Sequence, residues 1–184
     1  ATLGNAADFG DTGGPARWGL GGLADATRGV YGGGYIPATF KTSIEYVIIS
    51  SKGGSSDFGD FIGGSYRPAG CNSSTRGLFG GKFGPSSWVQ TNVIEFITIA
   101  STGNGSDFGD LQKGITNCGA VSSPTRGVFG GGENAINLIN YVTIATTGNA
   151  QDFGDLTVGR KEAYGSGSGV RGLFNGGMAT PVRV

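Results

Sequence analysis

Four copies of the tetrapeptide Asp-Phe-Gly-Asp hold the acidic side chains whose spacing suggests chemistry. The copies begin at Asp8, Asp57, Asp107 and Asp152. Each copy brings two carboxylates close together, and paired carboxylates are ligands for a hard cation such as Ca²⁺. One copy supplies only two such groups, whereas Ca²⁺ takes roughly six to eight oxygen ligands. We therefore predict that these aspartates are structural and cap hairpin turns through nearby backbone N–H groups, with a calcium site as the alternative.

The triplet Asp-Phe-Gly also holds magnesium in protein kinases, but the rest of a kinase site is missing. That site requires a glycine-rich phosphate loop and a catalytic loop that contains histidine. The chain has no histidine, which also excludes Ser-His-Asp sites and histidine-ligated metals. We predict no catalytic residue, no metal and no cofactor, and the fourfold recurrence indicates a building unit.

The composition indicates one ordinary domain with a core and gives no support for nucleic acid or membrane as a partner. The 184 residues are 37% hydrophobic and 14% charged, with 13 basic and 13 acidic side chains. There is no basic cluster, and no apolar run approaches the length of a membrane span. The missing initiator Met leads us to expect a piece of a longer polypeptide. The two cysteines, Cys71 and Cys118, are predicted to be free and buried.

Each acidic motif is followed by an arginine that opens a similar stretch, such as RGVYGGG or RGLFGGK. An apolar pair followed by glycines predicts a strand that ends in a tight turn with positive φ. We expect the arginines to satisfy carbonyl groups or pair with nearby aspartates, with an anion-binding ring as the alternative. They are Arg28, Arg76, Arg126 and Arg171.

A second strand precedes each motif except the first. It is predicted at residues 44–50, 94–100 and 139–145, where β-branched residues alternate around a fixed aromatic position. The first copy lacks this strand, but Val182–Val184 aligns with Ile97–Ile99 when the chain ends are joined. We therefore predict an all-β fold with one domain over residues 1–184. It is a β-propeller of four blades closed through the N- and C-terminal strands, one blade being split between the termini. The alternative is two chains that form an eight-bladed ring.

The double glycines and the strand aromatics resemble the kelch and galactose-oxidase type of propeller repeat. The matching residues are Gly32-Gly33, Gly80-Gly81, Gly130-Gly131 and Gly176-Gly177, with Tyr46, Phe96 and Tyr141. The segment YVTIATTGNAQDFGDLT is similar in sequence to repeats of marine bacteriophage structural and tail-fibre proteins, cyanophages in particular. This resemblance implies a structural role on a virion or another extracellular surface, with other fibre subunits as partners.

The loops between the double glycine and the next strand do not repeat, and variable loops on a rigid scaffold often carry binding function. They contain the aromatic residues Tyr35, Phe40, Phe83 and Trp88, which suit a sugar ring, a subunit contact or a cover over the core. Three further aromatics, Trp18, Tyr66 and Tyr164, are expected to be packing residues.

We therefore expect a non-enzymatic structural and binding module of a tail fibre or similar appendage, which presents its loops to a host-surface glycan or a neighbouring subunit. One alternative is a glycan hydrolase or lyase on a propeller scaffold, for which no convergent pair of acids can be named. Its few acids outside the motif are Asp25, Glu45, Glu95, Glu133 and Glu162. The other alternative is an architectural spacer with no ligand.

Overall fold

The protein is a series of antiparallel β-sheets that follow one another in chain order. The computed structural model describes residues 4–84 and 88–179, and these form no helix, so none that is long and apolar enough to cross a membrane. The first sheet has the order β1-β2-β4-β5, with β3 paired to β2. Its strands are β1 (Trp18–Ala24), β2 (Arg28–Ile36), β3 (Thr39–Phe40), β4 (Ser43–Ile48) and β5 (Ser56–Asp60).

The second and third sheets repeat this plan with four strands each. The second consists of β6 (Ala69–Asn72), β7 (Arg76–Gly80), β8 (Val93–Thr98) and β9 (Ser106–Asp110). The third consists of β10 (Gly119–Ser122), β11 (Arg126–Gly130), β12 (Leu138–Thr143) and β13 (Gln151–Asp155). The fourth unit has two strands among the described residues, β15 (Tyr164–Gly167) and β16 (Gly172–Asn175), and next to them β14 (Arg160–Lys161) pairs with β17 (Met178–Ala179).

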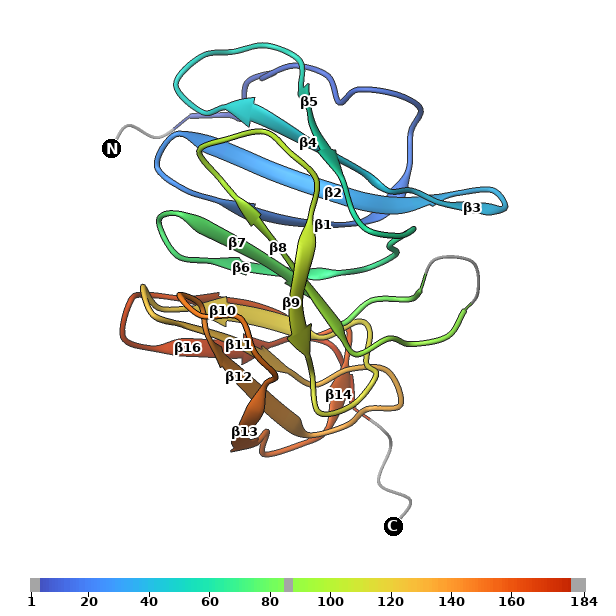
Figure 1. Ribbon diagram of the computed structural model, residues 1–184, viewed down its shortest axis with the longest axis vertical. Helices are drawn as coiled ribbons and strands as arrows, with labels where there is room; N and C mark the ends of the chain where they lie inside the picture. The colour runs from blue at the N-terminus through green and yellow to red at the C-terminus, as the bar shows by residue number, and fades with distance from the viewer. Residues whose placement is uncertain (1–3, 85–87, 180–184) are drawn as a thin grey trace.

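The first three sheets succeed one another along the longest axis of the molecule (Figure 1). The first sheet lies at one end of this axis, the third sheet lies toward the other, and β16 of the fourth unit lies beside β10 and β11. The all-β prediction is confirmed, and the strands predicted before each motif are β4, β8 and β12. The predicted closing strand, Val182–Val184, lies outside the described residues, which form an open array.

The Asp-Phe-Gly-Asp motif lies on the outer strand of a sheet and not in a hairpin turn, so the turn prediction for Asp57, Asp107 and Asp152 is wrong. Each of these outer strands carries a β-bulge at the same place. Ile44 pairs with Gly59 and Glu45 pairs with Asp57, which leaves Phe58 as the extra residue, and β8–β9 and β12–β13 repeat this shift. A bulge redirects the side chain of the extra residue. Phe58 and Phe108 are accordingly buried in the hydrophobic clusters between sheets.

The hairpin between the first two strands of each sheet is capped by a different residue, one that the sequence reasoning missed. Asp25 Oδ1 accepts hydrogen bonds from the backbone N–H groups of Thr27 and Arg28, both at 2.7 Å. Ser73 and Ser123 occupy the same place before Arg76 and Arg126, whose N–H groups donate to their hydroxyl oxygens at 3.2 and 3.1 Å. The signal was the recurring Asp or Ser three residues before each arginine.

Two hydrophobic clusters hold the sheets together. One combines Phe58 with Ile97 and Ile99 of the following sheet, and the other combines Phe108 with Val142 and Ile144. Burying a side chain of this size stabilises the fold by about 1.5–3 kcal/mol. These phenylalanines therefore contribute much of the stability of the contacts between successive sheets, which we call joints. Cys71 and Cys118 lie in the second cluster as free, buried thiols, as predicted.

Candidate functional site

The four aromatic residues of the variable loops come together on one side of the array. Tyr35 lies on β2 and Phe40 on β3, while Phe83 and Trp88 lie on the loop between β7 and β8. The ring centroid of Trp88 is 5.1 Å from Phe40 and 5.4 Å from both Tyr35 and Phe83. These residues are therefore contributed by two neighbouring sheets to one surface, which we call the aromatic cluster and which also includes Trp18 and Tyr66.

Tyr66 is the centre of the aromatic cluster. Its ring stacks on Phe40 with an interplanar angle of 9° and on Phe83 with an angle of 18°. Only 4% of Tyr66 is exposed, whereas 59% of Trp88 is exposed although rings surround it. Aromatic pairs of this kind contribute about 0.5–1.5 kcal/mol each beyond their buried area. The cluster thus holds an accessible indole in a fixed orientation.

The predicted packing roles of three aromatics have different outcomes. Tyr66 is buried as expected, and Trp18 packs edge-on against Tyr35 at 5.1 Å while remaining half exposed. Tyr164 is 72% exposed, so its predicted packing role is wrong. The loop of Phe83 and Trp88 covers Tyr66, whereas no described loop covers Tyr164.

A polar network adjoins the aromatic cluster at Tyr66. Arg67 donates from Nε to the Tyr66 hydroxyl at 3.0 Å, and from Nη1 to Asn117 Oδ1 at 2.8 Å and to Glu162 Oε1 at 3.0 Å. Asn117 Nδ2 in turn donates to Glu133 Oε2 at 2.6 Å. Burial opposes the charge of Arg67, but its bonds to Glu162 and Tyr66 raise the pKa of the guanidinium above its ordinary value.

Glu133 is held ionised by the same network. Burial opposes its negative charge, yet the bonds from Asn117 and Lys161 hold the pKa of this carboxyl below its ordinary value. Lys161 Nζ lies 3.2 Å from Glu133 Oε1. The network therefore presents both signs of charge, with Arg67 and Glu162 each more than a third exposed.

The network residues share an unusual backbone conformation. Arg67, Asn117 and Glu162 have φ values of 56°, 57° and 57°, and Gly19 has 73° at the corresponding place in the first unit. A left-handed conformation costs a non-glycine residue of order 1–3 kcal/mol and persists only where the surroundings impose it. All four residues line a cavity of about 550 Å³, which is bordered by β1, β6, β10 and β15. This site was not predicted from the sequence, because the four equivalent positions carry four different residue types and so show no repeated motif.

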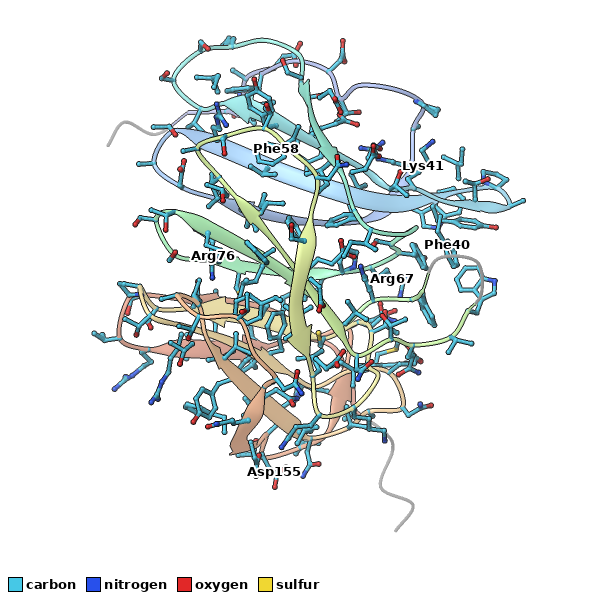
Figure 2. All side chains as sticks on the ribbon, viewed as in Figure 1. Phe40, Lys41, Phe58, Arg67, Arg76 and Asp155 are labelled. Atoms are coloured by element: carbon cyan, nitrogen blue, oxygen red, sulfur yellow. The ribbon has the colours of Figure 1, made fainter. Side chains whose placement is uncertain are left out.

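The repeated arginines lie away from this cavity. Arg28 Nη1 donates to the Ile99 carbonyl at 2.8 Å, and Arg76 Nη1 donates to the carbonyls of Ile144 and Ala145 at 2.9 and 3.1 Å. Figure 2 shows Arg76 on the opposite side of the array from Phe40 and Arg67. These guanidiniums tie one sheet to the next and do not converge on an anion site.

The other two repeated arginines have fewer partners in the described part of the chain. Arg126 stacks over the Tyr141 ring at 4.9 Å, much as Arg28 and Arg76 lie over Tyr46 and Phe96. Arg171 is exposed beside β16. Both border a second cavity, of about 410 Å³, between the third and fourth units.

The motif aspartates remain dispersed, with one pair on each of β5, β9 and β13 and the fourth pair, Asp8 and Asp11, in the segment before β1. Asp8 and Asp152 accept from the N–H of Gly10 and Gly154, at 3.2 and 3.0 Å, so they bond the backbone locally across the motif. Within residues 4–84 and 88–179, no three side chains of His, Cys, Asp or Glu gather in a way that could hold a metal ion. The residues present therefore do not form a calcium site of the kind considered from the sequence.

Two of the remaining acids serve the joints between sheets. Glu45 pairs with Arg17, and Glu95 pairs with Lys82, and all four side chains are at least nine-tenths buried. Each glutamate also accepts a backbone N–H from the turn that follows the preceding motif, from Gly13 and Ile62 respectively, at 2.8 Å. Glu45 and Glu95 thus lie in separate sheets and are engaged in structural contacts.

Comparison with known proteins adds no relative to this description. No protein-family model matches the chain, and no curated protein is detectably similar to it.

Proposed function

We propose that the protein is a non-enzymatic binding module of a surface appendage, such as a phage tail fibre, and that the aromatic cluster binds a glycan. The observation that carries this proposal is the convergence of the other three loop aromatics on an exposed, fixed Trp88. An indole face offers a flat apolar surface to the C–H groups of a sugar ring. Because the surrounding rings already fix its orientation, little side-chain entropy is lost on binding.

The polar network supports a sugar as the ligand. Arg67 lies directly after Tyr66 and joins the aromatic cluster to Asn117 and Glu162 through hydrogen bonds. Sugar hydroxyls both donate and accept, so a surface that offers a guanidinium, an amide and a carboxylate beside an apolar ring is complementary to them. A single contact of this size is weak, and an appendage gains avidity by presenting many copies.

An enzymatic role has less support. A glycosidase needs two carboxyl groups about 5–9 Å apart with room for the sugar between them. Glu45 and Glu95 are buried in ion pairs, and Glu133 and Glu162 are bound to Lys161 and Arg67. The acids therefore have structural partners, and none is poised as a general acid in an open cleft.

Glycan binding by single copies is the test, measured by calorimetry after a ligand has been selected on a glycan array. Trp88→Ala is expected to abolish binding with little loss of stability, because 59% of this side chain is exposed. Ile62→Ala removes a similarly exposed apolar side chain (64%) outside the aromatic cluster and should leave binding intact. If both variants bound equally, or if the wild-type protein bound no glycan, the proposal would give way to an architectural spacer without a ligand.

We also infer that the sheets are blades around a common axis, as in kelch-type propellers. The support is that β1, β6, β10 and β15, one strand from each unit, border the same cavity. Propellers typically have about four to eight blades. The first sheet and β13 lie at opposite ends of the longest axis (Figure 1), which favours two chains in an eight-bladed ring over closure of one chain on itself.

A further inference from the structure

The joint between successive units is built from the same backbone contacts each time. The N–H of Gly53, Gly103 and Gly148 donates to the carbonyl of the motif phenylalanine before it, at 2.9, 2.7 and 2.7 Å. Two residues later, Ser55, Gly105 and Ala150 donate to the carbonyl of the second motif aspartate, at 2.9, 2.8 and 2.7 Å. The array thus contains three equivalent joints. A fourth joint would require an equivalent pair of N–H groups to donate to the carbonyls of Phe153 and Asp155.

The motif glycine is required by the joint. A Cβ on Gly10, Gly59 or Gly109 would lie within 2.5 Å of the carbonyl oxygen of the glycine that follows across the joint. The corresponding space at Gly154 holds no described atom within 4 Å. The outer face of β13 therefore carries the motif residues of a joint, but no described residue packs against Gly154 as a glycine does at the other joints.

The motif phenylalanines show the same contrast between complete joints and the outer face of β13. Phe58 and Phe108 are each 2% exposed, whereas 53% of Phe153 is exposed. Arg28 and Arg76 each bind a carbonyl of the next sheet, while no described residue accepts from the Arg126 guanidinium. Phe153 and Arg126 both line the 410 Å³ cavity beside β16.

The N-terminal end of the array carries the matching half. Gly4-Asn5-Ala6 aligns with Gly103-Asn104-Gly105 and Gly148-Asn149-Ala150, and these residues are exposed in the described chain. Asn104 and Asn149 accept from the N–H of Asp60 and Asp110, both at 3.0 Å, so Asn5 offers the same acceptor for Asp155. The two halves lie at opposite ends of one chain (Figure 1).

We propose that a second copy of this chain supplies the missing half, with its Gly4–Ala6 docked on the β13 edge at Phe153, Gly154 and Asp155. The N–H groups of Gly4 and Ala6 then donate to the carbonyls of Phe153 and Asp155, as at the other three joints. Two copies related by a two-fold axis make two such joints and close a ring, which leaves no open end. This proposal rests on the propeller-type architecture inferred above and is independent of glycan binding.

Disulfide trapping tests the joint at a chosen pair of positions. In Ala6→Cys/Asp155→Cys, oxidation is expected to give a covalent dimer on a non-reducing gel. Ala150→Cys/Asp110→Cys places the same pair at a joint within one chain and should oxidise to a species of monomer mass. The native thiols of Cys71 and Cys118 are buried and do not compete.

Three outcomes would overturn the proposal. Trapping within a single chain would mean that four blades close on themselves. Failure to trap while the control pair oxidises would mean that the ends do not meet, and a ladder of higher oligomers would mean an open chain of copies. Solution mass gives a second reading: the native protein should be a dimer, and Phe153→Asp should be a monomer. Ile62→Asp, at an exposed site outside the joint, should remain a dimer.

Discussion

The guanidinium of Arg28 donates a 2.8 Å hydrogen bond to the carbonyl oxygen of Ile99, 71 residues further along the chain. Arg76 binds the carbonyl of Ile144 in the same way, 68 residues ahead. Each arginine also lies over an aromatic ring of its own sheet, Tyr46 or Phe96. One side chain therefore links the strands of a sheet to one another and the sheet to its successor.

Removal of this link should weaken the array. We expect Arg28→Ala to lower the free energy of unfolding by about 1.5–3 kcal/mol, the usual contribution of a hydrogen bond to a charged group. Chemical denaturation monitored by fluorescence measures this loss. Lys113→Ala removes a positive charge from an exposed site and should change stability by less than about 0.5 kcal/mol. Equal losses in the two variants would show that the carbonyl contact contributes nothing.

The buried pair Lys82–Glu95 has a natural replacement inside the same chain. The third sheet has Gly132 and Asn140 at these positions, and Asn140 Oδ1 keeps the backbone contact by accepting from the Gln112 N–H at 3.2 Å. Lys82→Gly alone leaves the Glu95 carboxylate buried without its partner, which should cost roughly 3–5 kcal/mol. We expect Lys82→Gly/Glu95→Asn to recover a large part of this loss in the same denaturation assay. A double variant no more stable than Lys82→Gly would argue against the exchange.

The two thiols should make the protein sensitive to alkaline pH. Burial raises the pKa of Cys71 and of Cys118 to about 12, from an ordinary value of 9.0. Because the unfolded chain ionises its thiols first, this contribution is complete below pH 9 and is lost as the pH rises toward 12. Denaturation midpoints between pH 8 and 11 should therefore fall less steeply in Cys71→Ala/Cys118→Ala. Thiol reagents at neutral pH should label the wild-type protein only after it unfolds.

Glu45 should make the stability of the protein fall at acid pH, the opposite direction from the thiols. Burial disfavours its charge, but hydrogen bonds from Ser55, Arg17 and Gly13 prevail and hold its pKa below the ordinary 4.5. A lowered pKa gives stability that is present above pH 4.5 and is lost as the pH falls through the folded-state value. Thermal unfolding followed from pH 6 to pH 3 should show a smaller loss in Glu45→Gln than in the wild-type protein. Parallel curves would contradict this assignment.

The strands with β-branched residues were predictable from sequence, and those with small residues were not. β4, β8 and β12 alternate Ile, Val and Thr around an aromatic, a pattern typical of half-buried strands. β6, with the sequence AGCN, has no such pattern because its small residues let neighbouring sheets approach closely. A Cβ on Gly70, for example, would lie 2.3 Å from the carbonyl oxygen of Gly22. This closeness is a property of the assembled sheets and leaves no periodic signal in one strand.

The aromatic members of the candidate site were predictable, but their meeting point was not. Tyr35, Phe40, Phe83 and Trp88 stand out because aromatic residues in unrepeated loops are uncommon in this chain. That they meet depends on adjacent sheets placing two loops against Tyr66. The network of Arg67, Asn117 and Glu162 was hidden because its shared feature is the backbone angle and not the residue type.

Because all joints between units are alike, the array can gain or lose complete units during evolution. The joints consist of backbone N–H and carbonyl groups together with a glycine, a phenylalanine and an arginine that every copy carries. Unequal recombination between two copies would remove or add one complete unit and would restore an intact joint at the crossover. The loops take no part in these contacts, so they can be exchanged along with the unit. A gene built in this way can change the loops of its product, and the number of its units, while each joint between units keeps the same contacts.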